Sequence, residues 1–298
     1  MRISRGPVDS SPTAARVSVS LGARQGLGGP PEERAMRRKG RRAGKPGREA
    51  PARMRGAALL GGLALLGLWA AKAARVGCSV GRYADYWAVP RGEAGGLLYV
   101  ALGDSAAQGV GASRPERGYV GLLAQRMRER TGRPVQVVNL SCSGARLADL
   151  VREQLPRLAE FSPDVVTVDI GGNDVVVYDP ERFSALVCEL TAGLPAGAFV
   201  ADVPYFMHGQ WERRAAETGR LLAGCAEENG LCVVRLHDAE QARGPAAMLT
   251  DFAADWFHPD DRGHRVWADS FWDRITNDPA LAAAPRLPGR PASARRSA

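Results

Sequence analysis

The chain has 298 residues, of which 45% are hydrophobic, so it is long enough to bury one full hydrophobic core. Its formal net charge of +8 comes from 40 Lys and Arg against 32 Asp and Glu, but the basic excess lies at the two ends. Residues 1–55 hold 14 basic and 4 acidic side chains and residues 277–298 hold 4 and 1, which leaves 22 basic and 27 acidic residues between them. Because this central part is mildly acidic, it lacks the footprint of a nucleic-acid-binding domain, and we expect no nucleic-acid partner.

The first 55 residues are rich in Arg, Gly and Pro and show no sustained apolar period. Such a composition buries too little apolar surface to offset the entropy of ordering the chain. We therefore predict a disordered basic segment at residues 1–55. Met54 directly precedes an apolar run, which leaves the true start codon open.

An uncharged stretch rich in Leu and Ala follows at residues 56–71, with basic residues on both sides. Its 16 residues are fewer than the roughly 20 needed to span a bilayer, and residues 71–73 resemble a small-x-small cleavage site, which favours a signal peptide. An uncleaved signal-anchor helix over 56–76 is the close alternative, and a buried core helix is a weaker one. The basic charge before the stretch predicts an extracytoplasmic domain, either secreted or membrane-anchored at the cell envelope.

Residues 77–96 have mixed polarity and are predicted to form a linker. A regular alternation then begins, with strands predicted at 97–102, 135–140, 165–170, 199–203 and 231–236, and helices at 119–130, 147–158, 182–194, 212–228 and 260–275. This order implies a parallel sheet with helices on both faces. We predict an α/β fold over 97–276, a three-layer α/β/α sandwich with a flavodoxin-like five-stranded sheet of order 2-1-3-4-5, followed by a loose tail at 277–298.

A candidate nucleophile, Ser105, lies in a Gly-Asp-Ser turn directly after the first predicted strand. A serine hydroxyl needs a base within hydrogen-bond reach, normally a histidine. Of the four histidines, His258 has Asp255 three residues before it, and this carboxylate could fix the imidazole tautomer and stabilise the imidazolium. His237, with Asp238 beside it, is the alternative base.

Acyl transfer also needs hydrogen-bond donors that face the developing oxyanion. The candidates are the backbone N–H groups of Ser105 and Gly144 and the side-chain amide of Asn173, which follow the first, second and third predicted strands. In a sheet of order 2-1-3-4-5 the first strand lies between the second and the third. The loops that carry Gly144 and Asn173 therefore flank the loop of Ser105.

These four blocks, Gly103-Asp104-Ser105, the Gly144 turn, Gly171-x-Asn173-Asp174 and Asp255-x-x-His258, resemble those of the SGNH hydrolase superfamily, also called GDSL esterases and lipases. The resemblance covers about residues 99–275. It implies the SGNH hydrolase fold, Ser105 as nucleophile and oxyanion donor, Gly144 and Asn173 as further oxyanion donors, His258 as base and Asp255 as its partner. It also implies a metal-free mechanism through an acyl-enzyme. The run Ala106-Ala107-Gln108 departs from many lipase members, which weakens an assignment to long-chain lipases.

Other site chemistries lack their motifs. The stretch Gly109-Val110-Gly111 has neither the Gly-Lys-Ser/Thr of a phosphate-binding loop nor a full Gly-x-Gly-x-x-Gly, and Asp169, Asp174 and His258 show no metal-ligand spacing. We expect no cofactor and no metal. The predicted function is a serine-dependent carboxylester hydrolase for a small acyl ester, an acylated carbohydrate or a lipid. An acyltransferase that uses the same triad, or a catalytically idle envelope-tethered binding domain, stays open.

Substrate specificity is set by loops that no motif constrains. Residues 110–118 and 205–211 are the predicted pocket walls. The five cysteines, Cys78, Cys142, Cys188, Cys225 and Cys232, leave an odd thiol if disulfides form, and Cys225 with Cys232 is one candidate pair. The remaining connectivity and the oligomeric state stay open.

Overall fold

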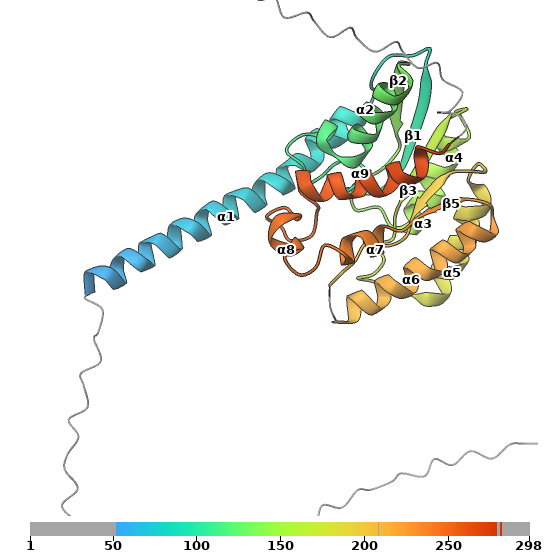
Figure 1. Cartoon of the computed structure of the whole chain (residues 1–298). Helices are drawn as coiled ribbons and strands as arrows, with labels where there is room; N and C mark the ends of the chain where they lie inside the picture. Colours follow the sequence, from blue (N-terminus) through green and yellow to red (C-terminus); the bar gives the residue numbers. More distant parts are fainter. Residues whose placement is uncertain (1–51, 208, 279–280, 282–298) are drawn as a thin grey trace, which may run out of the picture. The chain divides into compact units, whose positions relative to one another are not determined.

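The computed structural model describes residues 52–207, 209–278 and 281, with side chains from residue 64 onward (Figure 1). The predicted disordered segment up to residue 51, and the predicted tail apart from residues 277, 278 and 281, lie outside the described residues. Residues 52–55 are helical.

Five parallel strands form one sheet in the order β2-β1-β3-β4-β5, as predicted. They are β1 (Leu97–Gly103), β2 (Val135–Asn139), β3 (Val165–Asp169), β4 (Phe199–Ala201) and β5 (Cys232–Val234). Almost every residue of these strands is buried, because helices cover both faces of a parallel sheet and apolar runs are then needed on both sides. The α/β three-layer fold is confirmed.

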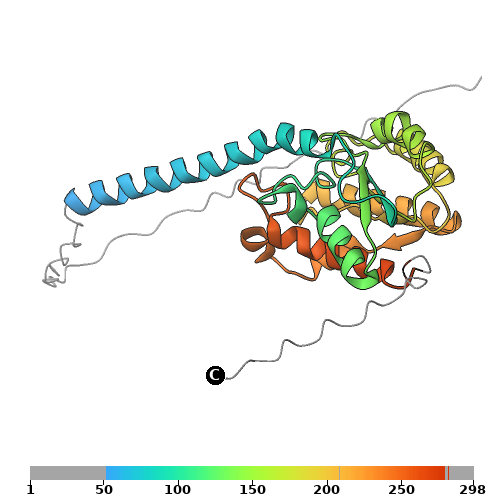
Figure 2. The same ribbon diagram turned by 90° about the horizontal axis from the view of Figure 1, so that it is seen from above.

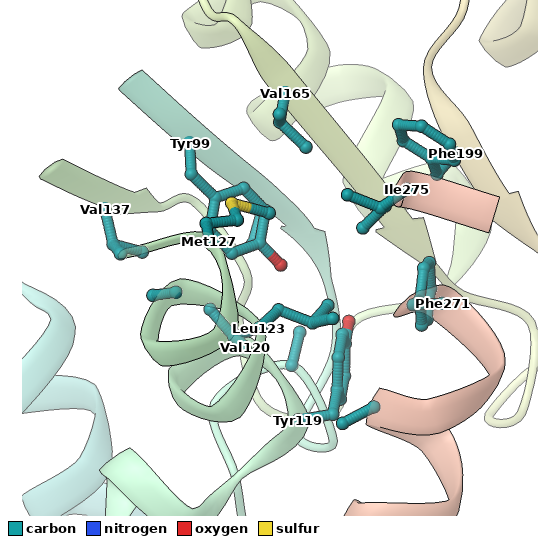
Figure 3. Close-up of a cluster of buried hydrophobic side chains, with 14 of the residues drawn as sticks. Tyr99, Tyr119, Val120, Leu123, Met127, Val137, Val165, Phe199, Phe271 and Ile275 are labelled. Atoms are coloured by element: carbon teal, nitrogen blue, oxygen red, sulfur yellow. The ribbon is translucent and has the colours of Figure 1, made fainter. Parts of the chain in front are cut away.

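One face of the sheet packs against α2 (Tyr119–Thr131) and α9 (Asp261–Ile275). Tyr119, Leu123 and Met127 lie four residues apart on α2, so they form one apolar stripe toward the sheet. Figure 3 shows this stripe beside Phe271 of α9, whose ring stacks on that of Tyr119 at a centroid distance of 5.2 Å. Both helices are thereby fixed to each other and to the sheet.

The other face packs against α5 (Pro180–Gly193), α6 (Gly209–Glu228) and the segment 147–158 (Figures 1 and 2). This segment is predicted as one helix but consists of α3 (Leu147–Asp149), a π-helical turn η2 (Leu150–Gln154) and α4 (Leu155–Leu158). Pro156 explains the difference, because proline has no N–H with which to continue the α-helical pattern. Short helices η1 (Pro115–Arg117), α7 (Leu236–Gln241) and α8 (Ala247–Thr250) complete the described elements.

The N-terminal helix α1 (Ala52–Trp87) contains the predicted targeting segment 56–76 and continues past it. The predicted linker 77–96 is therefore wrong over 77–87. Tyr83 and Trp87 lie one turn apart and are only 4% and 6% exposed, because they pack against the domain. The Tyr83 hydroxyl donates to the Ala112 carbonyl at 2.7 Å and the Trp87 indole N–H donates to the Gln108 carbonyl at 3.0 Å. These two contacts keep the helix regular where the sequence shows only mixed polarity.

Among the helices of the described residues, none combines the length and the apolar character that crossing a membrane requires.

Candidate active site

The predicted site residues lie at the carboxyl ends of the central strands. Ser105 follows β1, Gly144 lies in the loop after β2 and Asn173 in the loop after β3. His258 and Asp255 lie in the loop between α8 and α9. Neighbouring parallel strands end at the same edge of the sheet, so segments far apart in the sequence meet there.

Ser105, His258 and Asp255 form one hydrogen-bonded chain. The Ser105 hydroxyl lies 2.9 Å from His258 Nε2, and His258 Nδ1 lies 2.6 Å from Asp255 Oδ2. An ionised Asp255 can only accept, so it assigns the ring proton to Nδ1 and leaves Nε2 as the acceptor for the serine O–H. The arrangement is that of a nucleophile, its base and the carboxylate that orients the base.

Asp255 is held in its ionised form by the loop that carries it. Burial alone would raise the pKa of Asp255, but the hydrogen bond from the His258 ring, the His258 charge and the backbone N–H groups of His258 and Phe257 together lower it below its ordinary value. Those N–H groups donate to Asp255 Oδ1 at 3.1 and 3.2 Å. The same carboxylate thus shapes the turn and orients the imidazole.

The position of the His258 loop depends on two unusual backbone conformations. Trp256 has φ 58°, a left-handed conformation that is strained for a residue with a side chain. Gly111 has φ +94°, and a Cβ atom there would lie 2.2 Å from the Pro259 carbonyl oxygen. Only glycine lets segment 108–112 approach the His258 loop this closely. Segment 108–112, which follows Ser105, therefore packs directly against the loop that carries His258.

The candidate oxyanion donors lie around Ser105, with one feature that the sequence did not indicate. The Asn173 amide donates to Asp104 Oδ2 at 3.1 Å and to the Ala145 carbonyl at 3.0 Å. Asp104 also accepts from the Ala106 N–H at 3.0 Å, so it joins the Ser105 turn to Asn173. Burial raises the pKa of Asp104 to about 6. Asp104 stands inside the Gly-Asp-Ser block, so the motif contains it but gives no indication of its partner.

Gly144 has φ +79°, and no atom lies within 4 Å of the place that a Cβ would take. The turn is left-handed, which favours glycine. An oxyanion between Ser105 and Asn173 would share the amide protons that Asn173 donates to Asp104 and Ala145 in this structure. Asn173 is thus oriented by two acceptors, one directly before Ser105 in the chain and one directly after Gly144.

A cavity of about 420 Å³ opens beside Ser105 and His258. Its volume is in the range of small-molecule sites, and its lining is mainly apolar, with several aromatic side chains. Tyr205, Phe206, Met207 and Trp211 line it, as predicted for residues 205–211. No residue of the other predicted wall, 110–118, does, so that prediction is wrong. The segment packs instead between α1 and α9, where Ser113 binds Asp261 and Ala112 binds Tyr83.

The other histidines take different roles. His237 Nε2 lies 2.9 Å from Glu212 Oε1, and the His237 N–H donates to Asp202, so the alternative base is engaged away from Ser105. His264 is fully buried in α9, where burial lowers its pKa to about 4. His208 lies outside the described residues.

The candidate disulfide between Cys225 and Cys232 is not formed. Cys225 packs with the helices α5 and α6, whereas Cys232 packs on the α2 and α9 side of the sheet. The neighbour of Cys225 is Cys188, with 3.9 Å between the two sulfurs. In the part of the chain that the structure describes, no group of three or more His, Cys, Asp and Glu side chains is arranged to hold a metal ion.

Comparison with known proteins agrees with this geometry. The model of the GDSL-like Lipase/Acylhydrolase family matches residues 101–266. The fold is similar to the crystal structure of an alpha/beta hydrolase enzyme from the metagenome of Lake Arreo, Spain, with 26% identity, a TM-score of 0.52, and coverage of 62% of this chain and 97% of the other. A search of curated proteins gives no match.

Two further similar structures are variants of an acetyl xylan esterase from Geobacillus stearothermophilus. In one of them a tryptophan is replaced by isoleucine, and the other is a catalytic mutant in which an aspartate is replaced by alanine. Each has 25% identity and a TM-score of 0.50, with coverage of 60% of this chain and 94% of the other. Because the family match spans more than half of the chain and contains both Ser105 and His258, the chain belongs to the GDSL-like lipase/acylhydrolase family and is a serine esterase.

Proposed function

We propose that the chain hydrolyses carboxylic esters through an acyl-enzyme formed on Ser105. The observation that carries this proposal is the hydrogen-bonded chain from Ser105 through His258 to Asp255, with distances of 2.9 and 2.6 Å. Ser105 is the nucleophile, His258 the general base and Asp255 the residue that orients and stabilises the imidazolium.

In the first half of the reaction, Ser105 Oγ attacks the ester carbonyl carbon while His258 Nε2 takes the hydroxyl proton. The negative charge that develops on the carbonyl oxygen is met by the N–H groups of Ser105 and Gly144 and by the Asn173 amide. His258 then gives its proton to the departing alcohol oxygen, which leaves an acyl group on Ser105. In the second half, water attacks the acyl carbon, His258 takes a proton from it, and the serine hydroxyl is restored as the acid departs.

The substrate class we propose is a small acyl ester, an acylated carbohydrate or a lipid. The likeness to acetyl xylan esterase variants supports an acylated carbohydrate, and the aromatic lining of the cavity also suits a sugar ring or an apolar chain. We further propose an extracytoplasmic location, secreted or anchored at the envelope through residues 56–76. What supports the location is the uncharged stretch with basic residues before it.

The test is hydrolysis of p-nitrophenyl acetate and p-nitrophenyl butyrate by the native chain, Ser105→Ala and His258→Ala. We expect both variants to lose at least about 1,000-fold in kcat/KM, because a triad acts as a unit. Ser270→Ala is the matched control, since its hydroxyl bonds to the Val266 carbonyl within α9, and it should hydrolyse both esters at the native rate. Equal activity of the native chain and Ser105→Ala would contradict the proposal.

The same assay separates the two other functions. An acyltransferase would transfer the acyl group to an added alcohol such as glycerol, and the new ester would form at the expense of free acid. A binding domain would leave all esters intact while the protein stays folded by circular dichroism. Hydrolysis that depends on Ser105 and yields free acid in the presence of glycerol excludes both.

A further inference from the structure

The ionisable side chains that line the cavity beside Ser105 are acidic, apart from His258. These acidic residues are Asp104, Asp169, Glu240 and Tyr205, and no Lys or Arg is found among the described residues that line the cavity. Asp104 is engaged with Asn173 and Ala106. Asp169 and Glu240 are therefore the carboxyl groups to which a bound molecule could add a partner.

Asp169 is a buried carboxyl group with an unsatisfied oxygen. It is the last residue of β3, it is only 2% exposed, and its Oδ2 has no hydrogen-bond partner among the described residues. An unpaired buried polar atom is destabilising, so such atoms are rare unless a water, an ion or a ligand completes them. Because Asp169 lines the cavity, a rotation of its carboxyl group would bring this oxygen to a molecule bound there, which can supply the missing partner.

Glu240 is fixed in position by two hydrogen bonds, but its carboxylate oxygens can accept further ones. The Trp267 indole N–H donates to its Oε1 at 2.6 Å and the Tyr205 N–H donates to its Oε2 at 2.8 Å. Each carboxylate oxygen accepts more than one hydrogen bond, so both can bind a further donor or cation. Burial raises the pKa of Glu240 to about 7, and burial together with the charges of Asp104, Glu240 and Asp202 raises that of Asp169 well above its ordinary value. A cation beside these groups would favour their ionised forms.

Aromatic rings make up much of the remaining lining. They are Tyr205, Phe206, Trp211, Phe252, Trp256, Phe257 and Trp267. The face of an aromatic ring attracts a cation, Trp most strongly, and quaternary ammonium groups are bound in proteins by such rings. A cavity lined by aromatic rings and carboxyl groups, without a basic residue other than His258, suits a cationic group better than an anionic one.

Resting on the esterase function proposed above, we infer that the preferred substrate is an ester with an ammonium group, which binds between the aromatic rings and the carboxyl groups of Asp169 and Glu240. The group can belong to the alcohol half or to the acyl half of the ester. In both cases the group carries a positive charge within an apolar shell. It binds in the cavity that opens beside Ser105.

Matched pairs of substrates test this inference. For the alcohol half, acetylcholine is compared with its neutral carbon isostere, 3,3-dimethylbutyl acetate. For the acyl half, the p-nitrophenyl ester of γ-trimethylammoniobutyrate is compared with its neutral carbon isostere. In at least one pair we expect kcat/KM to be about tenfold or more higher for the cation. In Asp169→Asn and Glu240→Gln, which keep the side-chain shape, this ratio should fall toward one.

The control variant is Asp238→Asn, which removes a carboxylate two residues from Glu240. Asp238 is 74% exposed and does not line the cavity, so the ratio should stay at its native value. A ratio at or below one for both pairs in the native chain would overturn the inference and indicate a neutral apolar substrate group. The same holds if the ratio is unchanged in both cavity variants.

A binding measurement separates this inference from the esterase proposal. Tetramethylammonium chloride is titrated into the native chain by calorimetry, with sodium chloride at equal ionic strength as the reference. We expect saturable binding that weakens about tenfold in Asp169→Asn and stays unchanged in Asp238→Asn. If no ester is hydrolysed, the esterase proposal fails and this titration alone decides the cation site. If esters are hydrolysed but tetramethylammonium does not bind and no cation preference exists, only the cation site fails.

Discussion

Replacing Asp255 with asparagine should inactivate the enzyme while leaving the fold intact. Asp255 Oδ1 accepts the backbone N–H groups of Phe257 and His258, and an amide oxygen in that place keeps both bonds. Oδ2, 2.6 Å from His258 Nδ1, becomes an NH₂ group that can only donate. His258 Nδ1 must then accept, so the ring proton moves to Nε2 and faces Ser105 Oγ. The base can no longer take the serine proton.

The wrong tautomer should lower kcat for p-nitrophenyl acetate by about 1,000-fold to 10,000-fold, which corresponds to about 4–5.5 kcal/mol of transition-state stabilisation. The free energy of unfolding in urea should change by less than about 1 kcal/mol, because the turn keeps its hydrogen bonds. Asp255→Ala is the contrasting variant, since it removes the turn bonds as well and should lose both activity and stability. Retention of more than a tenth of the native kcat in Asp255→Asn would refute the tautomer argument.

Three further predictions concern stability. The neutral ring of His264 accepts from the Tyr119 N–H and donates to the Val110 carbonyl, and its pKa is lowered to about 4. As the pH falls, the unfolded chain therefore protonates this histidine before the folded chain does, so the free energy of unfolding should drop by about 3 kcal/mol between pH 6.5 and 4. In urea titrations over the same pH range, His264→Gln should show a smaller drop. Oxidised glutathione, which takes up two electrons, should form a disulfide between Cys188 and Cys225, which are 37 residues apart, and raise the free energy of unfolding by about 4 kcal/mol. Peptide mapping detects the disulfide and urea unfolding measures the gain. Cys188→Ser should abolish the disulfide, and Cys142→Ser should not. Trp87→Ala should lower the free energy of unfolding by about 3–5 kcal/mol, because it removes a buried indole. A chain that begins at Gly77 keeps this contact and should unfold like the full chain. Equal stability of Trp87→Ala and the native chain would contradict the packing of α1.

The sequence predicts the sheet because its strands are apolar runs bounded by clear turns. The predicted strands at 97–102, 135–140 and 165–170 agree with β1, β2 and β3 to within one residue at each end. A parallel sheet buried on both faces leaves little freedom for such runs. The strand ends then bring Ser105 and Asn173 together, so most of the candidate site follows from topology.

The sequence does not predict contacts that depend on tertiary packing. Tyr83 and Trp87 occur in a stretch of mixed polarity, and only the domain surface beneath them makes that stretch a docked helix. Asp169 at the end of β3 and Glu240 in α7 both line the cavity, and no local spacing links them. Cys225 has Cys232 near it in sequence, but the sheet lies between the two.

The contact of α1 with segment 108–112 extends the functional unit of this enzyme beyond the part that matches the family. The family match begins at residue 101. Tyr83 and Trp87 nevertheless donate hydrogen bonds to segment 108–112, which follows Ser105 and packs against the loop of His258. A fusion protein in which the residues before Val89 are replaced would thus lose the Tyr83 and Trp87 contacts to segment 108–112, although it would keep every family motif. Domain shuffling and expression design for this chain should place the boundary ahead of Tyr83, inside the helix, and not at the first strand.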